Sequence, residues 1–164
     1  MHSVWRAVVL GVVVTLGVVL GADSVSLSAQ ASDPRIGTWK LNVAKSKYSP
    51  GPAPRSNTMK LEASGQGEKY TTEGVNAEGG RIAVQYTANF DGKDYPITGS
   101  QNVDTVSLKR VDARTTERTN KKGGKVTVII TSVVSQDGKT MTNTVKGTNA
   151  QGQTVNNVVV WEKQ

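Results

Sequence analysis

Cysteine is absent from this chain of 164 residues, and histidine occurs once, as His2. The lack of thiols excludes disulfide staples, thiol nucleophiles and cysteine metal sites. The lack of a histidine after position 2 excludes imidazole-based triads, typical zinc sites and haem ligation by histidine in the rest of the chain. No two carboxylates have a spacing that brings them together on one strand face. We therefore expect no catalytic residue, no metal, no cofactor and no enzyme; a histidine-free enzyme acting through carboxylate, Tyr or Lys side chains is the alternative.

Long apolar runs are also scarce. The chain has one, Ala7–Ala22, and its length of about 16 residues is below the roughly 20 that a membrane-spanning helix needs. A short basic start precedes this run, and Ala29-Gln30-Ala31 follows it with the small-x-small pattern of a signal-peptidase site. We predict a signal peptide over 1–31, one mature domain over 32–164, and export to the periplasm or the medium. Retention of the first segment as an uncleaved anchor is the alternative.

Helical periodicity is missing as well, because no long segment combines it with a cap. Short segments of alternating apolar and polar residues occur instead, separated by glycine-centred turns at nearly even intervals. This pattern is typical of an up-and-down antiparallel sheet. An open sheet of that size would leave two long edges unpaired, and closure removes them. The sequence therefore predicts an all-β fold, an up-and-down antiparallel β-barrel of about 8–10 strands.

The turns divide the mature chain into about ten expected strands. A short helical turn capped by Asn42 is expected over 42–47. The three prolines of 49–54 predict an extended loop, and Pro96 places its strand at an edge or a gap. The expected strands are Ile36–Leu41, Thr58–Ser64, Glu68–Asn76, Arg81–Phe90, Asp94–Thr98, Val103–Val111, Ala113–Asn120, Lys125–Val134, Thr140–Lys146 and Thr154–Lys163.

Gly37-Thr38-Trp39 stands in the first expected strand, and Lys40-Leu41-Asn42 continues it. These residues resemble the Gly-x-Trp signature of the lipocalins and their calycin relatives, in particular small exported lipocalin-like proteins of bacteria with no assigned role. The expected strand number is closer to the fatty-acid-binding branch of that group. The resemblance implies a barrel that holds a small apolar or amphipathic ligand.

The last expected strand departs from what the resemblance implies. Secreted lipocalins place an Arg near its end to stack on the signature Trp, and here Lys163 is the available substitute. Fatty-acid binders hold a carboxylate with an Arg-x-Tyr pair on this strand, which here contains neither residue. The strand does contain Trp161, and we interpret Trp39 and Trp161 as a plug that closes one barrel end.

The expected strand 113–120 is polar on both faces. A closed barrel turns one face of every strand inward, so part of the interior is predicted to be polar. Arg114 and Arg118 share a face, and their planar guanidinium groups suit an anionic head group. The alternative is that both arginines are solvated. Four more residues complete the candidate ligand-binding set, the aromatic ones being either pocket-lining or simply half-buried in strands: Tyr70, Tyr86, Phe90 and Asn143.

Basic residues outnumber acidic ones by 20 to 13, which gives a net charge of +7. Lys121-Lys122-Gly123-Gly124-Lys125 reads as a basic hairpin tip, either solubilising or weakly attracted to an anionic envelope surface. Aromatic residues amount to 5% and are not interleaved with the basic ones, so nucleic-acid binding is not expected. We expect a monomeric binder of a small apolar or amphipathic molecule. The alternative is a ligand-free structural or interaction protein of the cell envelope that uses its loops and this tip.

Overall fold

A computed structural model describes residues 33–149 and 151–164, which form ten strands and, within those ranges, no helix. No segment in this part of the chain is therefore a helix of the length and apolarity needed to span a membrane. The predicted signal peptide lies outside the described residues. The strands are β1 (Gly37–Lys47), β2 (Ser56–Ser64), β3 (Gly67–Val75), β4 (Arg81–Asn89), β5 (Tyr95–Thr98), β6 (Thr105–Arg110), β7 (Thr115–Lys122), β8 (Lys125–Val134), β9 (Thr140–Thr148) and β10 (Thr154–Lys163).

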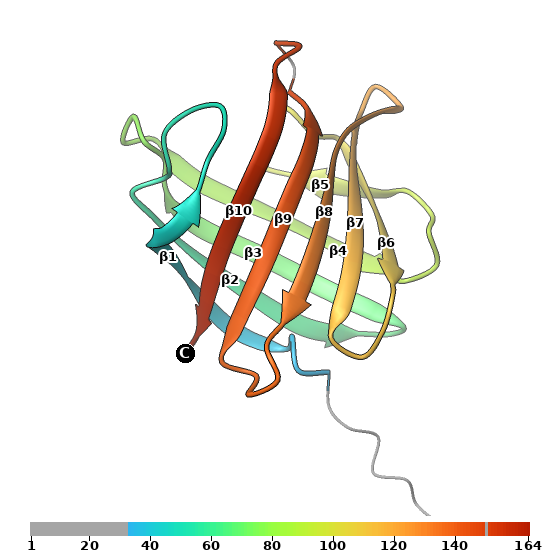
Figure 1. Ribbon diagram of the computed structural model, residues 1–164. Helices are drawn as coiled ribbons and strands as arrows, with labels where there is room; N and C mark the ends of the chain where they lie inside the picture. Colours follow the sequence, from blue (N-terminus) through green and yellow to red (C-terminus); the bar gives the residue numbers. More distant parts are fainter. Residues whose placement is uncertain (1–32, 150) are drawn as a thin grey trace, which may run out of the picture. The chain divides into compact units, whose positions relative to one another are not determined.

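The ten strands close into one barrel in which every strand pairs antiparallel with its neighbours in the sequence, and β1 also pairs with β10. Figure 1 shows β8, β9 and β10 on the near wall and β2, β3 and β4 on the far wall. The predicted all-β meander barrel is confirmed. Its closure satisfies the backbone groups that an open sheet would leave exposed at its edges.

One predicted element is wrong. Residues 42–47 continue β1 as a strand and do not form a helical turn. The β1–β10 register shifts here, from Asn42 opposite Val160 to Lys47 opposite Val158. The Asn42 side chain accepts a hydrogen bond from the Lys45 backbone N–H at 2.9 Å, as a helix cap would, but inside a local irregularity of the strand. An Asn side chain makes the same hydrogen bond to the backbone in a helix cap and in a strand bulge, so Asn42 alone did not distinguish the two structures.

Pro96 lies in the weakest part of the barrel wall, as predicted. The four-residue strand β5 pairs with β4 through two residue pairs and with β6 through two more. Proline removes a ladder donor, which limits pairing around it.

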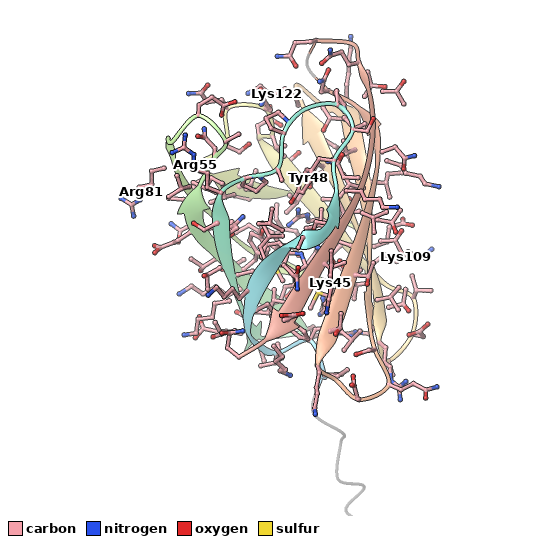
Figure 2. The ribbon with its side chains drawn as sticks, turned by 60° about the vertical axis from the view of Figure 1, so that its left-hand side comes forward. Lys45, Tyr48, Arg55, Arg81, Lys109 and Lys122 are labelled. Carbon is pink, nitrogen blue, oxygen red and sulfur yellow. The ribbon has the colours of Figure 1, made fainter. Side chains whose placement is uncertain are left out.

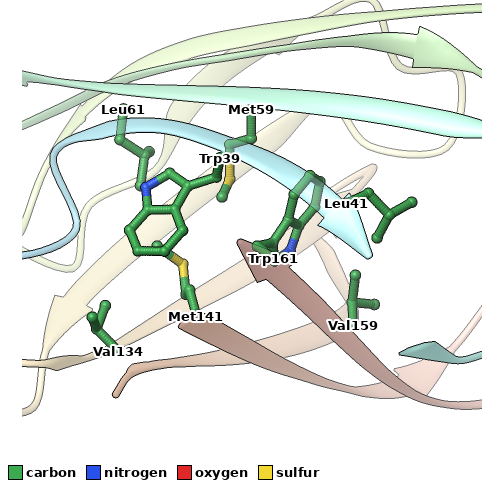
Figure 3. Packing of buried hydrophobic residues seen from close by; sticks show 8 residues of the cluster. All are labelled: Trp39, Leu41, Met59, Leu61, Val134, Met141, Val159 and Trp161. Atoms are coloured by element: carbon green, nitrogen blue, oxygen red, sulfur yellow. The ribbon is translucent and has the colours of Figure 1, made fainter. Parts of the chain in front are cut away.

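An apolar cluster packs inside the barrel near the start of β1 and the end of β10 (Figure 3). The two residues of the predicted plug, Trp39 and Trp161, are 0% and 5% exposed and both belong to this cluster, so we call this end of the barrel the plugged end. The Lys163 Nζ lies 5.1 Å from the centroid of the Trp39 ring, so the lysine takes the stacking position expected for it. The Trp39 indole N–H donates to the Arg35 carbonyl at 2.8 Å and ties the N-terminal segment across the same end. The cluster consists of Trp39, Leu41, Met59, Leu61, Val134, Met141, Val159 and Trp161.

Candidate ligand-binding site

The inner face of β7 carries a polar row into the barrel. Thr116 and Asn120 are buried, so the strand alternation turns Arg118, which lies between them, inward as well. Arg114 lies in the turn before β7 and is exposed. The two arginines proposed as a pair are therefore separated: Arg118 reaches the interior, and Arg114 does not line it.

Arg118 lies against two stacked tyrosines. The rings of Tyr70 and Tyr86 are 4.8 Å apart with an interplanar angle of 7°. The Arg118 guanidinium carbon lies 5.0 Å from the Tyr70 centroid and 5.5 Å from the Tyr86 centroid. One guanidinium nitrogen also donates to the Tyr86 hydroxyl at 3.4 Å. These contacts hold the cation on aromatic surface within the barrel.

Tyr86 links Arg118 to the carboxylate of Glu68. The Tyr86 hydroxyl donates to Glu68 Oε1 at 2.7 Å, so its oxygen is left to accept from Arg118. Burial is the main cause that raises the pKa of Tyr86 well above its usual value, and Arg118 only partly opposes it. Tyr86 therefore stays protonated at physiological pH and keeps this donor role.

Glu68 is neutralised from the N-terminal segment. Arg35 Nη1 lies 2.7 Å from Glu68 Oε2 in an ion pair that is not aligned as a hydrogen bond, and the two residues are 2% and 3% exposed. Arg35 also donates to Thr116 Oγ1 at 3.1 Å and to Asp33 at 2.9 Å. Burial tends to lower the pKa of Arg35, but Glu68 and Asp33 outweigh it, so the guanidinium is firmly charged.

A second arginine completes this end. Arg110 donates to the Asp33 carboxylate at 2.6 Å and stacks on Phe90, with its guanidinium carbon 4.3 Å from the ring centroid. Arg35 approaches the same ring to 5.0 Å. Burial would raise the pKa of Asp33, but the hydrogen bonds from Arg35 and Arg110 hold it below its usual value. Phe90 therefore belongs to the closure of the barrel, outside the residues that line the internal cavity.

Arg118 is left without a counter-ion. Among residues 33–149 and 151–164, no carboxylate forms an ion pair with it, and its Nε is buried without a hydrogen-bond partner. The ionised side chains that line the internal cavity are Arg35, Glu68 and Arg118, which leaves one net positive charge. A cation that is partly desolvated and unpaired is costly unless something compensates it.

The cavity beside Arg118 has a volume of about 20 Å³, which is room for about one water molecule. Four of the predicted ligand-binding residues line it: Tyr70, Tyr86, Arg118 and Asn143. Sequence reasoning missed Arg35, Glu68, Thr116 and Ser132. Of these four, Glu68 could have been predicted from the sequence, because strand alternation places it on the same inward face of β3 as Tyr70 and Thr72.

Burial decreases along the strands toward the end that carries the β1–β2 loop. On β4, Tyr86 is buried whereas Val84 and Ile82, on the same face, are half-buried. On β8, Ile130 is buried and Val128 half-buried. Figure 2 shows Tyr48, Arg55, Arg81 and Lys122 at this same end. Strands β9 and β10 follow the same trend, with Met141 and Val159 buried and Val145 and Val155 half-buried. The inward side chains are therefore less tightly covered at the end opposite the plug, which we call the mouth.

A larger hollow of about 510 Å³ lies outside the barrel over β8 and β9. Its walls include Ile129, which is 40% exposed, together with Thr131, Thr144, Lys146 and Gly147. It contains none of the buried polar atoms that lack partners, so the internal site is the stronger candidate despite its small volume.

In the part of the chain that the structure describes, no group of three or more His, Cys, Asp or Glu side chains converges as a metal site would.

Comparison with known proteins supports the fold. No family model matches the chain, and no curated protein matches it in sequence. Among solved structures, the zebrafish ileal bile acid-binding protein in complex with cholic acid is similar with a TM-score of 0.50 and 14% identity. The match covers 80% of this chain and 99% of that protein. The chain therefore has the closed ten-stranded antiparallel barrel of the lipocalin and fatty-acid-binding type.

Proposed function

We propose that this protein binds one small amphipathic molecule inside its barrel and holds the anionic group of that molecule on Arg118. The observation that carries the proposal is the unpaired Arg118 cation with its partnerless Nε, aimed into an internal cavity of net positive charge. An incoming carboxylate, sulfate or phosphate supplies the missing counter-charge. Arg suits such a group because its fork makes two parallel hydrogen bonds to it.

The apolar part of the ligand extends toward the open mouth. Val84 and Val128 lie on the inner wall toward the β1–β2 loop end, and Val145 lies in the register row of Arg118. All three are half-buried. The fold neighbour, which was solved in complex with cholic acid, supports this type of barrel as a container for an amphipathic acid.

Binding requires the interior to expand. The cavity of about 20 Å³ is far smaller than the roughly 300 Å³ at which small-molecule sites begin. Met59 and Met141 line it beside Arg118, and their flexible unbranched side chains repack at modest cost. We therefore propose that the ligand displaces these side chains when it enters.

We also propose that the protein is exported and is a binder, without catalytic activity. The N-terminal apolar run with its small-x-small sequence supports export. The lack of histidine and cysteine in 33–164 supports a binding role.

The small cavity favours one second candidate. A barrel with a filled interior would serve as a structural or interaction protein of the envelope, using the β7–β8 turn with Lys122 and Lys125 as its basic contact. Both lysines are exposed and available to an anionic surface.

Calorimetric titration with two chains of equal length separates these functions. We expect dodecanoate to bind saturably at one site and dodecyltrimethylammonium not to bind there. Arg118→Gln should weaken dodecanoate binding about tenfold or more, since hydrogen bonds to charged groups contribute about 1.5–3 kcal/mol. Arg114→Gln is the matched control and should bind as the wild type does, because Arg114 is exposed outside the barrel. Dodecanoate binding that is equal in Arg118→Gln and wild type would refute the proposed site.

A further inference from the structure

Three small polar side chains form a continuous row across the inner wall. Thr116 of β7 is the register partner of Ser132 of β8, and Ser132 is the register partner of Asn143 of β9. All three line the internal cavity together with Arg118. Directly paired residues on adjacent strands have side chains about 5 Å apart on one face, so the row is a single polar stripe.

The stripe has hydrogen-bonding capacity that nothing in the described chain uses. Asn143 Oδ1 is buried and has no partner. The Thr116 oxygen accepts from Arg35, which fixes the side chain and leaves its O–H to donate elsewhere. Buried polar atoms without partners are rare in native proteins, and each one is costly to leave unsatisfied.

Trp161 adds an unused donor next to the stripe. Its indole Nε1 is buried without a partner, and the side chain as a whole is 5% exposed. Trp161 pairs with Met141, and Val159 pairs with Asn143, so Trp161 and Asn143 are diagonal neighbours on adjacent strands. Diagonal neighbours lie within reach of aromatic and long side chains. One end of the stripe thus offers both an acceptor and a donor.

We propose that Thr116, Ser132 and Asn143 form a second polar subsite that receives an uncharged hydroxyl group of the ligand. This inference rests on the proposed function and narrows its ligand to an anionic amphipath that carries a hydroxyl on its apolar body. The subsite is distinct from the anion site because none of its three side chains is charged. An unsubstituted hydrocarbon at this subsite would leave the buried Asn143 amide without a hydrogen-bond partner, which is unfavourable in free energy. A hydroxyl on the ligand would supply that partner.

The geometry of the wall sets the separation between the two polar groups. Thr116 and Arg118 are two residues apart on one face of β7, which corresponds to about 7 Å along the strand. Asn143 lies two strands away from β7, or about 10 Å across the sheet. The stripe lies on the side of Arg118 that faces the plugged end, whereas the apolar part of the ligand extends toward the opposite end. A hydroxyl close to the anionic group therefore reaches the stripe, and one at the far end of the chain does not.

A single buried water is the competing explanation. The cavity of about 20 Å³ holds about one water, which would satisfy part of the stripe without any ligand hydroxyl. If that explanation holds, a hydroxyl on the ligand does not increase binding affinity. The hydroxyl reduces the apolar surface that the ligand buries, and the polar side chains of the stripe are already hydrogen-bonded to the water.

The test compares the affinities of ligands with and without a hydroxyl group for the wild-type protein and for two variants. The affinities are measured by calorimetric titration of the full protein. The probes are dodecanoate, 3-hydroxydodecanoate and 12-hydroxydodecanoate. We expect 3-hydroxydodecanoate to bind wild type about five- to tenfold more tightly than dodecanoate does, and 12-hydroxydodecanoate, whose hydroxyl lies far from the stripe, to show no such gain. Asn143→Val replaces the amide with an apolar side chain that suits a strand, and it should abolish that preference while dodecanoate still binds. Ser132→Ala is the second variant and should reduce the preference. Thermal melts of both variants confirm that they fold.

The outcomes separate the subsite from the anion site. If 3-hydroxydodecanoate binds wild type no more tightly than dodecanoate does, while dodecanoate binding still depends on Arg118, the subsite is overturned and the proposed function stands. A preference that persists unchanged in Asn143→Val and Ser132→Ala also overturns the subsite. If none of the three probes binds the wild-type protein, both the subsite and the proposed function are contradicted.

Discussion

Arg35 and Glu68 form an ion pair of 2.7 Å between two side chains that are 3% and 4% exposed, and this pair joins the N-terminal segment to β3. A buried pair is weak evidence for stability as a whole, but removing one partner leaves an uncompensated charge. Because Arg35 also contacts Asp33, the two partners are not equivalent.

Arg35→Met is therefore expected to destabilise the domain by about 3 kcal/mol or more, and Glu68→Gln by clearly less. The first change leaves Glu68 as a buried, unpaired carboxylate, whereas the second leaves Arg35 with Asp33 as its partner. Urea unfolding at neutral pH measures both values. The double variant Arg35→Met, Glu68→Met should recover part of the loss, and equal losses in the two single variants would contradict this order.

Tyr86→Phe should cost about 1–2 kcal/mol in the free energy of unfolding, because its hydroxyl donates to the buried carboxylate of Glu68 at 2.7 Å. Tyr95→Phe is the matched control. Its hydroxyl donates to Asp91 at 2.9 Å in an exposed pair, and we expect a change within about 0.5 kcal/mol. A loss at Tyr95 as large as that at Tyr86 would show that burial is not the cause.

Asp33 gives the domain an acid-sensitive contribution to stability. Its pKa is lowered in the folded protein, since the hydrogen bonds from Arg35 and Arg110 outweigh its burial. The stability it adds is therefore present above the unfolded pKa of about 3.9 and is lost as pH falls through the lower folded value. We expect the difference in unfolding free energy between wild type and Asp33→Asn to be constant from about pH 5 upward and to shrink below about pH 4. A difference that grows on acidification would have the wrong sign.

Removal of the unpaired cation should stabilise the ligand-free barrel. Arg118→Met keeps a long flexible side chain and removes a charge that has no carboxylate partner among the described residues, and we expect a gain of about 1 kcal/mol. The same variant should lose dodecanoate binding. Thermal or urea unfolding gives the first result. A clear destabilisation would assign Arg118 a structural role in place of a binding one.

Much of the barrel was predictable from the sequence. Alternation and glycine turns mark the strands, and the predicted and observed limits of β8 and β10 coincide. The contact between Lys163 and the Trp39 ring was also predictable, because Lys163 is the cation available at the end of the last strand. The error at 42–47 arose because Asn42 has the side chain of a helix cap and used it in a strand irregularity.

The site was predictable only in part. Both faces of β7 are polar, so its own sequence could not show whether Arg118 points inward. The answer depends on Tyr70 and Tyr86, which approach from β3 and β4 across the barrel. Arg35 precedes the first strand, where no periodic pattern exists, and its pairing with Glu68 follows from closure of the barrel alone.

Native mass spectrometry of the full protein purified from its own source, combined with extraction of bound molecules, tests the central proposal most directly. We expect one small acidic molecule bound per chain in the wild type and in Arg114→Gln, and no such molecule in Arg118→Gln. A wild-type protein that carries no molecule, and that also fails to take up dodecanoate, would contradict it and favour the filled-barrel alternative.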